Sequence, residues 1–446
     1  MKLAQALRFA QSTIFNPQSA IAFVGAGGKT TALFHLAREL TSSEGPVIVT
    51  ATTHLHIDQI KLADSHWIVE KPEDFPGLEE NLRGVMLITG SVDGDRTTGL
   101  NNGLMSRLRE VCSSHNLPML IEADGSRQRP LKAPADHEPV IPEFVETIVL
   151  VAGLTGLGKP LVKEVVYQPE TFARLGNLKM GETITPEALA LVLTHPAGGL
   201  KNIPLQARRI VLLNQAETPE LQAQGKTLAE KLLPLYHSII IASLKQSQIY
   251  AVYERVSGII LAAGGSSRFG QPKPLLDWHG QPFVRAVAQA ALTAGLSPVV
   301  SVTGANAEQV ESAIHDLPIT ITRNENWQDG QSTSIKAGLH TLPIETGAAI
   351  FLLADQPQTT PAVLRALTEE HARTLAPIIA PLVDGQRANP VLFDRLTFPD
   401  LMALSGDVGG RAVFSRYTIS YLPWHDTGLL GDVDTPEDYR KLVNGE

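Results

Sequence analysis

One segment constrains the fold of this chain more than any other, because it joins a buried strand to a glycine-rich loop with basic residues. Residues 258–274 read GIILAAGGSSRFGQPKP, and the apolar residues 259–261 predict a short strand. The small residues after that strand let backbone N–H groups approach phosphate oxygens, while Arg268 and Lys273 supply positive charge. We predict a loop that holds a nucleoside triphosphate. The competing interpretation is a tight strand-to-helix turn with two solvated cations.

An acidic residue follows a second apolar strand of this half. Residues 348–357 read AAIFLLADQP, so Asp355 comes where the strand ends. Ligand crevices of open α/β sheets lie at the carboxyl edge of the strands, and a carboxylate there suits the Mg2+ that accompanies a triphosphate. We therefore predict Asp355 as a metal ligand.

A pair of acidic residues lies near the end of the sequence. Residues 431–438 read GDVDTPED, and Asp432 and Asp434 share one face if this segment is extended. We predict that one of the two completes the metal site. The alternative is an Asx-type turn before a helix that begins at Thr435 and Pro436, and the two interpretations are compatible.

The first half carries a separate signal for phosphate binding. Residues 21–31 read IAFVGAGGKTT and lead into a helix-like segment, so they resemble a P-loop in which Lys29 and backbone amides hold phosphates and Thr30 reaches Mg2+. Phe23 occupies the position where a P-loop usually has its first glycine, which predicts a shortened or altered loop. The glycines available are Gly25, Gly27 and Gly28. A plain strand-to-helix turn is the alternative.

Further strands of the first half end in polar residues. In residues 118–125, PMLIEADG, we predict that Asp124 meets the magnesium of the glycine loop, with Glu122 as the competing candidate. Residues 121–142 are long, polar and rich in proline, which by itself predicts a surface loop. Residues 210–217, IVLLNQAE, are faintly similar to the base-reading Asn-Lys-x-Asp of GTP-binding proteins, but the lysine and the aspartate are replaced, so no guanine preference is inferred.

The second half resembles the MobA-like nucleotidyltransferases. Residues 329–334 (DGQSTS), 384–393 (DGQRANPVLF) and 405–413 (SGDVGGRAV) are similar to the molybdenum cofactor cytidylyltransferase branch of that family, although Ala388 stands where the family usually has glycine. Because of that departure, the sequence does not determine the backbone path beside Asn389. The resemblance implies nucleotide contacts from Leu261, Ala262, Ala263, Gly264, Gly265, Ser266, Gln331 and Ser332, acceptor contacts from Asn389 and Arg411, and catalytic roles for Arg268, Lys273 and Asp355.

The first half resembles a different family. Residues 121–142, IEADGSRQRPLKAPADHEPVIP, are similar to the hallmark of YqeC-type accessory proteins of molybdenum hydroxylases. The resemblance implies a nucleotide-binding domain that assists maturation of a molybdenum hydroxylase, with the apo-hydroxylase as a partner.

The function that these resemblances imply is transfer of CMP from CTP, or of a nucleotidyl group from another NTP, to molybdopterin. An acceptor phosphate oxygen attacks the α-phosphorus and pyrophosphate leaves, with Mg2+ as the cofactor. No general base is required, because a phosphate monoester is largely ionised near neutral pH. A guanylyl or sugar-phosphate nucleotidyltransferase is an alternative, and a non-catalytic chaperone that binds the cofactor for a hydroxylase is an alternative of another class.

Length and composition agree with two α/β enzyme domains. The chain has 446 residues, 43% hydrophobic and 19% charged, and strands alternate with helical segments through both halves. We predict two doubly wound domains, a P-loop-like domain over residues 1–250 and a Rossmann-like nucleotidyltransferase domain over residues 256–446. A net charge of −9 argues against a nucleic-acid partner, the apolar runs are too short for a membrane span, and the single cysteine fits the cytoplasm.

Overall fold

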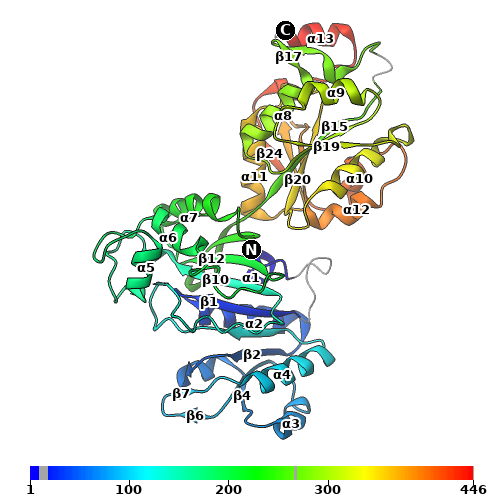
Figure 1. Ribbon diagram of the computed structural model, residues 1–446. Coiled ribbons are helices and arrows are strands. Elements are labelled where there is room, and N and C mark those ends of the chain that lie inside the picture. Colours follow the sequence, from blue (N-terminus) through cyan, green and yellow to red (C-terminus); the bar gives the residue numbers. More distant parts are fainter. Residues whose placement is uncertain (10–18, 266–268, 445–446) are drawn as a thin grey trace. The chain divides into compact units, whose positions relative to one another are not determined.

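The computed structural model describes residues 1–9, 19–265 and 269–444 (Figure 1). The chain divides into two compact units, Met1–Tyr253 and Glu254–Glu446. Each unit has its own sheet, its own helices and its own apolar core, and the α/β fold class predicted from the sequence is confirmed. No helix among the described residues is long and apolar enough to cross a lipid bilayer.

A nine-stranded sheet forms the centre of the first unit. Its strands, in spatial order, are β14 (Gln248–Glu254), β13 (Ser238–Ser243), β12 (Arg208–Asn214), β10 (Thr147–Gly153), β1 (Ala20–Gly25), β8 (Met119–Glu122), β2 (Val47–Ala51), β5 (Val85–Thr89) and β4 (Ser65–Ile68). Strand β1 runs parallel to both of its neighbours, β10 and β8. All six of its residues are buried, as the apolar sequence AIAFVG requires of a strand covered on both faces.

Helices cover both faces of this sheet. Alternate residues of β1 (Ala20, Ala22 and Val24) join the core cluster that includes α4, whereas helix α2 contacts β1, β2 and β8 outside that cluster. Cys112 lies on α4, and burial raises the pKa of its thiol to about 12, which fits a packing role. The helices of the unit are α1 (Leu3–Ala6), α2 (Lys29–Glu44), α3 (Phe75–Glu79), α4 (Asn102–Ser114), α5 (Pro169–Leu175), α6 (Pro186–Thr194) and α7 (Pro219–Leu232).

Two small sheets lie apart from the main one in the first unit. Strands β9 (Leu131–Lys132) and β11 (Val166–Tyr167) form the first, and β3 (Leu55–His56), β7 (Arg96–Thr97) and β6 (Val92–Asp93) form the second. Strand β9 belongs to residues 121–142, which the sequence predicts as a surface loop. That prediction is wrong for the middle of the segment, where Lys132 and Glu138 are buried.

The second unit contains an eight-stranded mixed sheet. Its strands, in spatial order, are β19 (Thr320–Arg323), β18 (Val299–Thr303), β15 (Val256–Ala262), β20 (Ala348–Leu353), β23 (Val391–Asp394), β21 (Ile378–Val383) and β22 (Gln386–Arg387), with β24 (Ile419–Pro423) paired to β21. Strand β15 is parallel to β18 and β20, whereas β23 is antiparallel to its neighbours. Strands β16 (Asp277–Trp278) and β17 (Gln281–Pro282) form a separate hairpin.

The alternation of strand and helix predicted for this half is present. Residues 283–294 form α8 (Phe283–Ala294), and the next two elements are β18 and α9 (Ala307–Ile314). The remaining helices are α10 (Gln331–Thr341), α11 (Pro361–Thr374), α12 (Phe398–Met402) and α13 (Pro436–Asn444). The start of α13 at Pro436 agrees with the capping signal read from the sequence.

The segment between the halves differs from the prediction. The polar-to-mixed residues 243–255 suggest a connector, but most of them form β14, the edge strand beside β13. An edge strand needs only one apolar face, so its mixed sequence resembles that of a linker.

Candidate functional sites

The glycine loop of the first unit connects β1 to α2 in a conformation that side chains would not permit. Gly25, Gly27 and Gly28 have φ angles of +96°, +86° and +117°. A Cβ atom on Gly27 would overlap the backbone of Gly153 and lie 2.7 Å from the carbonyl oxygen of Pro130. The loop is therefore closely fitted against neighbouring strands and loops.

Two amides of this loop bind protein carbonyls. The Ala26 N–H donates to the oxygen of Val151 at 2.8 Å, and the Gly27 N–H donates to the oxygen of Arg129 at 3.0 Å. The loop thus has fewer amides free for a ligand than a full P-loop. The first N–H groups of α2 follow directly, and such groups have no acceptor within their own helix.

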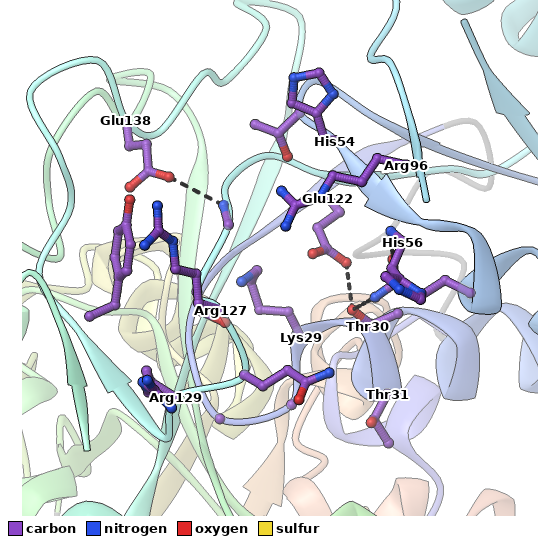
Figure 2. Close-up of a pocket in the computed structure, with 18 of the residues that line it drawn as sticks. Lys29, Thr30, Thr31, His54, His56, Arg96, Glu122, Arg127, Arg129 and Glu138 are labelled. Carbon is purple, nitrogen blue, oxygen red and sulfur yellow. Dashed lines mark hydrogen bonds between the residues drawn. The ribbon is translucent and has the colours of Figure 1, made fainter. Parts of the chain in front are cut away.

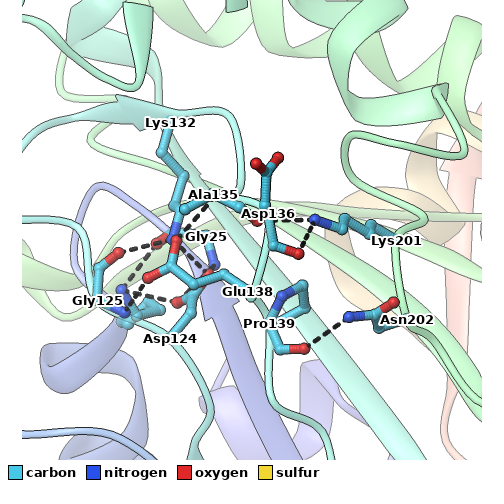
Figure 3. Close-up of polar contacts among 11 residues, drawn as sticks. Gly25, Asp124, Gly125, Lys132, Ala135, Asp136, Glu138, Pro139, Lys201 and Asn202 are labelled. Carbon is cyan, nitrogen blue, oxygen red and sulfur yellow. Dashed lines mark hydrogen bonds and ion pairs between the residues drawn. The ribbon is translucent and has the colours of Figure 1, made fainter. Parts of the chain in front are cut away.

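Lys29 belongs to a buried ion-pair network behind the loop, and Figure 3 shows the part of that network around Asp124, Lys132 and Glu138. Its Nζ donates to the Gly25 oxygen at 2.7 Å and lies 3.1 Å from Asp124 Oδ1, and both side chains are 3% exposed. Asp124 also accepts from the Gly25 N–H, at 3.0 and 3.1 Å, and from Lys132 at 2.8 Å. Burial lowers the pKa of Lys29, but the nearby carboxylates, above all Asp124, outweigh burial and raise it.

Glu122, rather than Asp124, lies next to Thr30. The Thr30 hydroxyl donates to Glu122 Oε2 at 2.8 Å, and burial raises the pKa of that carboxyl group. Glu122 lines the cavity in front of the loop, whereas Asp124 faces the lysines behind it. Of the two candidates for the magnesium of the glycine loop, Glu122 therefore contacts Thr30, whereas Asp124 contacts Lys29, Lys132 and the Gly25 N–H; a metal role for either carboxylate stays a prediction.

The cavity in front of the loop has a volume of about 1010 Å3. Gly27, Gly28, Lys29 and Thr30 line it, but the predicted loop residue Gly25 is not among its described lining residues. Three arginines also line it; Figure 2 shows Arg127 and Arg129 on one side of Lys29 and Arg96 on the other, near Glu122. The cavity is thus lined by Lys29 and three arginines together with two buried carboxylates, Glu122 and Glu138.

Asn214, at the end of β12, connects the glycine loop to a neighbouring turn. Its Nδ2 donates to the Gly27 oxygen at 2.8 Å, and its Oδ1 accepts from the Leu244 N–H at 3.0 Å. The Asn-Gln-x-Glu segment noted in the sequence therefore fixes the position of the loop through its asparagine.

In the second unit, two of the predicted acidic residues lie beside Lys273, and the third, Asp432, interacts with Asp355. The Lys273 Nζ lies 2.8 Å from Asp434 Oδ1 and 3.7 Å from Asp355 Oδ2, and Asp432 Oδ1 accepts from Gln356 Nε2 at 2.7 Å. Burial raises the pKa of Asp355; Lys273 lowers it, and Asp432 and Asp434 raise it further. Asp355 follows the end of β20, at the sheet edge where the sequence predicts it.

Among the described residues, no group of three or more His, Cys, Asp or Glu side chains is arranged to hold a metal ion. Magnesium bound with a nucleotide takes most of its ligands from phosphates and water and only one or two from carboxylates. The oxygen donors near Lys273 fit that requirement.

A pocket of about 270 Å3 brings together residues from separate segments of the second unit. Leu261 and Gln331, predicted to contact the nucleotide, line it with Asn389 and Arg411, predicted to contact the acceptor. Phe351, Phe393 and Phe414 also line it, and the sequence does not identify them as site residues because each reads as an ordinary core residue. Only the meeting of β20, β23 and the segment after α12 puts them in one place.

The other predicted nucleotide contacts lie differently. Ala262 and Ala263 are buried at the end of β15, and Gly264 and Gly265 are exposed. Ser332 is buried, and its hydroxyl donates to the Gly406 oxygen at 2.7 Å; its contact with a nucleotide stays a prediction. Ser266 and Arg268 lie outside the described residues.

Comparison with known protein families agrees with the two resemblances. The family described as YqeC protein matches residues 21–170, and the MobA-like NTP transferase domain matches residues 258–420. The uncharacterized protein YqeC of Escherichia coli K12 is 34% identical over 205 residues, which cover 44% of this chain and 75% of that protein.

Two further relatives are named for enzymatic activities. The nicotine blue oxidoreductase of Paenarthrobacter nicotinovorans is 31% identical over 202 residues, covering 42% of this chain and 96% of that protein. A probable molybdenum cofactor guanylyltransferase of Bacillus anthracis is 25% identical over 193 residues, covering 42% of this chain and 94% of that protein. The chain therefore belongs to the YqeC family in its first half and to the MobA-like NTP transferase family in its second half, and it joins the two in a single polypeptide.

Proposed function

We propose that the second unit transfers CMP from CTP to molybdopterin and releases pyrophosphate. The observation that carries the proposal is the pocket that Leu261 and Gln331 line together with Asn389 and Arg411. A transferase must hold a nucleotide and an acceptor at once, and these residues come from four separate segments of the chain. Lys273 and the carboxylates of Asp355, Asp432 and Asp434 would supply the charges that such a reaction needs.

Positioning and charge neutralisation would provide most of the catalysis. The acceptor phosphate oxygen attacks the α-phosphorus, and the bond to the β-phosphate oxygen breaks as pyrophosphate leaves. Lys273 stabilises the charge on the phosphates, and Asp355 with Asp432 or Asp434 would hold Mg2+. A bound Mg2+ supplies neutralisation of the leaving pyrophosphate.

The glycine loop after β15 supports a close ligand. A Cβ atom placed on Gly264 would meet no protein atom within 4 Å, so packing does not require glycine at this position. A nucleotide lying against the backbone would require it, because only glycine leaves that surface free of a side chain.

The identity of the base is the least constrained part of this proposal. The relative named as a probable molybdenum cofactor guanylyltransferase keeps GTP as an alternative to CTP. The direct test is pyrophosphate release by the full-length chain with molybdopterin and either CTP or GTP. Release with CTP supports the proposal, release with GTP alone replaces it with guanylyl transfer, and release with neither leaves the non-catalytic chaperone.

For the first unit we propose nucleotide binding in support of a molybdenum hydroxylase in the cytoplasm, with the apo-hydroxylase as partner. The cavity lined by Gly28, Lys29 and Thr30 supports this role. Lys29→Ala should remove nucleotide binding by this unit and the ability to support an active hydroxylase in cells, while nucleotidyl transfer in vitro continues. Unchanged nucleotide binding by the variant would reduce the loop to a structural turn.

A further inference from the structure

We propose that Arg127 and Arg129 form a phosphate subsite beside the glycine loop of the first unit. The inference deepens the proposed nucleotide binding by that unit and rests on it. Its ligand is a phosphate group, either the terminal phosphate of a nucleoside triphosphate or the phosphate of a second molecule bound next to a nucleoside diphosphate.

The backbone fixes the segment that carries these arginines directly against the loop. The Gly27 N–H donates to the Arg129 oxygen at 3.0 Å, and the Gly153 N–H donates to the Pro130 oxygen at 2.9 Å. The first of these bonds takes an amide that would otherwise face a phosphate. The same bond brings a guanidinium-bearing residue to that place, so an arginine can replace the lost amide contact.

The side chain of Arg127 has a defined position. Arg127 and Gln128 have φ angles of +48° and +60°, so two consecutive residues other than glycine take the left-handed conformation in a turn closed by the Arg129 N–H and the Ser126 oxygen at 3.0 Å. The guanidinium of Arg127 lies 5.7 Å from the centre of the Tyr167 ring. Stacking on this ring holds the guanidinium at the cavity wall shown in Figure 2.

The positive charge of the two arginines is not neutralised by protein carboxylates. The nearby Asp124 and Glu138 are each 2.8 Å from Lys132, and Asp124 also pairs with Lys29. Neither Arg127 nor Arg129 forms an ion pair with any residue in the part of the chain that the structure describes. Two unpaired guanidinium groups in one cavity match the oxygens of a phosphate, to which arginine donates two parallel hydrogen bonds.

The cavity has room for such a ligand in addition to the phosphates on the loop. Its volume of about 1010 Å3 lies at the upper end of the range for small-molecule sites. Its lining continues past Lys29 and Thr30 to Arg127, Arg129 and Tyr167. The subsite is thus an extension of one cavity.

Hydrogen exchange on the full-length chain provides a readout confined to the first unit, which matters because the second unit is also proposed to bind nucleotide. Amide protection is followed in peptides covering residues 24–34 and 121–132. The probes are ADP and GDP, the β,γ-imido analogues of ATP and GTP, and inorganic phosphate with and without the diphosphates, all with Mg2+. The variants are Arg127→Ala, Arg129→Ala and the double variant, with Arg174→Ala as the control because Arg174 is exposed on α5 and does not line the cavity.

We expect the triphosphate analogue to bind at least tenfold more tightly than the diphosphate, with the preference reduced below threefold in the double variant and kept in Arg174→Ala. That result places the terminal phosphate at the arginines. If the two nucleotides bind equally, but inorganic phosphate protects residues 121–132 in wild type and not in the double variant, the subsite belongs to a separate phosphate ligand.

Two results would overturn the subsite. One is a triphosphate preference that survives in the double variant; the other is the absence of both a triphosphate preference and phosphate protection in the wild type. Diphosphate binding to residues 24–34 is read in the same experiment. If the diphosphate binds but neither the triphosphate preference nor the phosphate protection depends on the arginines, only the subsite is rejected. If the diphosphate does not bind, nucleotide binding by the loop is rejected as well. Arg127→Lys and Arg129→Lys, which keep the charge without the fork of donors, should retain part of the effect.

Discussion

Asp355 combines burial with a neighbouring cation, and the two act on it in opposite directions. Burial raises the pKa of its carboxyl group, Lys273 lowers it, and the raised direction prevails. A carboxyl group whose folded-state pKa is raised reduces stability once it ionises. This loss of stability is absent below the pKa of the unfolded state, about 3.9, and develops as the pH rises from there through the higher pKa of the folded state.

Asp355→Asn should therefore remove nucleotidyl transfer and stabilise the fold at neutral pH. The neutral amide avoids the burial of a charge, and Lys273 keeps Asp434 as a partner at 2.8 Å. Thermal unfolding at pH 7 and pH 4 measures the effect. We expect a higher midpoint for the variant at pH 7 and a smaller difference at pH 4. A variant that is less stable at pH 7, or that retains turnover, would contradict the role given to this carboxylate.

Lys273→Ala should lower kcat for nucleotidyl transfer by about 10²- to 10³-fold, the usual loss when a donor to developing negative charge is removed. The Nζ of Lys273 lies between Asp434 and Asp355, so it is positioned for phosphates that share their metal. Steady-state kinetics with varied nucleotide separate kcat from KM. A change in KM alone would make Lys273 a binding residue. Exposed Lys231, in the other unit, provides the control variant Lys231→Ala.

At the scale of elements, the turn between β1 and α2 requires glycine at residue 27 for two reasons, its backbone conformation and its close packing. Gly181, between α5 and α6, shares only the first: the φ angles of Gly27 and Gly181 are +86° and +84°. A Cβ atom on Gly27 would meet the backbone of Gly153 and Pro130, whereas one on Gly181 would meet nothing within 4 Å. Substitutions at Gly27 and Gly181 therefore separate the cost of the left-handed backbone conformation from the cost of steric overlap.

Gly27→Ala should therefore be more destabilising than Gly181→Ala. The left-handed conformation costs an alanine about 1–2 kcal/mol at either position, and overlap adds to that at Gly27 alone. Urea unfolding of both variants gives the two free energies. We also expect Gly27→Ala to lose nucleotide protection of residues 24–34 and Gly181→Ala to keep it. Equal destabilisation would show that the loop can move away from Pro130.

At the scale of the whole molecule, each of the two units contains a complete sheet and a separate apolar core. Strand β14 completes the first sheet at Glu254, and β15 begins the second at Val256. The peptide between these strands is therefore the natural place to divide the chain.

A fragment of residues 256–446 should fold and keep nucleotidyl transfer within about threefold of the full chain. Pyrophosphate release with molybdopterin is the assay, and the same fragment with Lys273→Ala is the inactive control. A folded fragment without activity would mean that the first unit completes the transferase site. A fragment of the first unit should extend through Glu254, because ending at residue 250 would cut β14.

The sequence determined the elements and the ends of strands from which both sites are built. Apolar runs followed by glycine or aspartate identify β1, β15 and β20, because a strand buried on both faces must be apolar and its carboxyl end must turn to leave the sheet. These features depend on neighbours in the chain and can be read from it.

Only the tertiary structure decided which polar groups meet. Glu122 and Asp124 are both acidic residues near the end of β8, but one accepts from Thr30 and the other pairs with Lys29 and Lys132. Ser332 turns to the oxygen of Gly406, and Arg129 reaches the glycine loop through its carbonyl. Such pairings join residues far apart in sequence, and no local pattern encodes them. They are set by the register of the strands and by the requirement that buried charges and donors find partners.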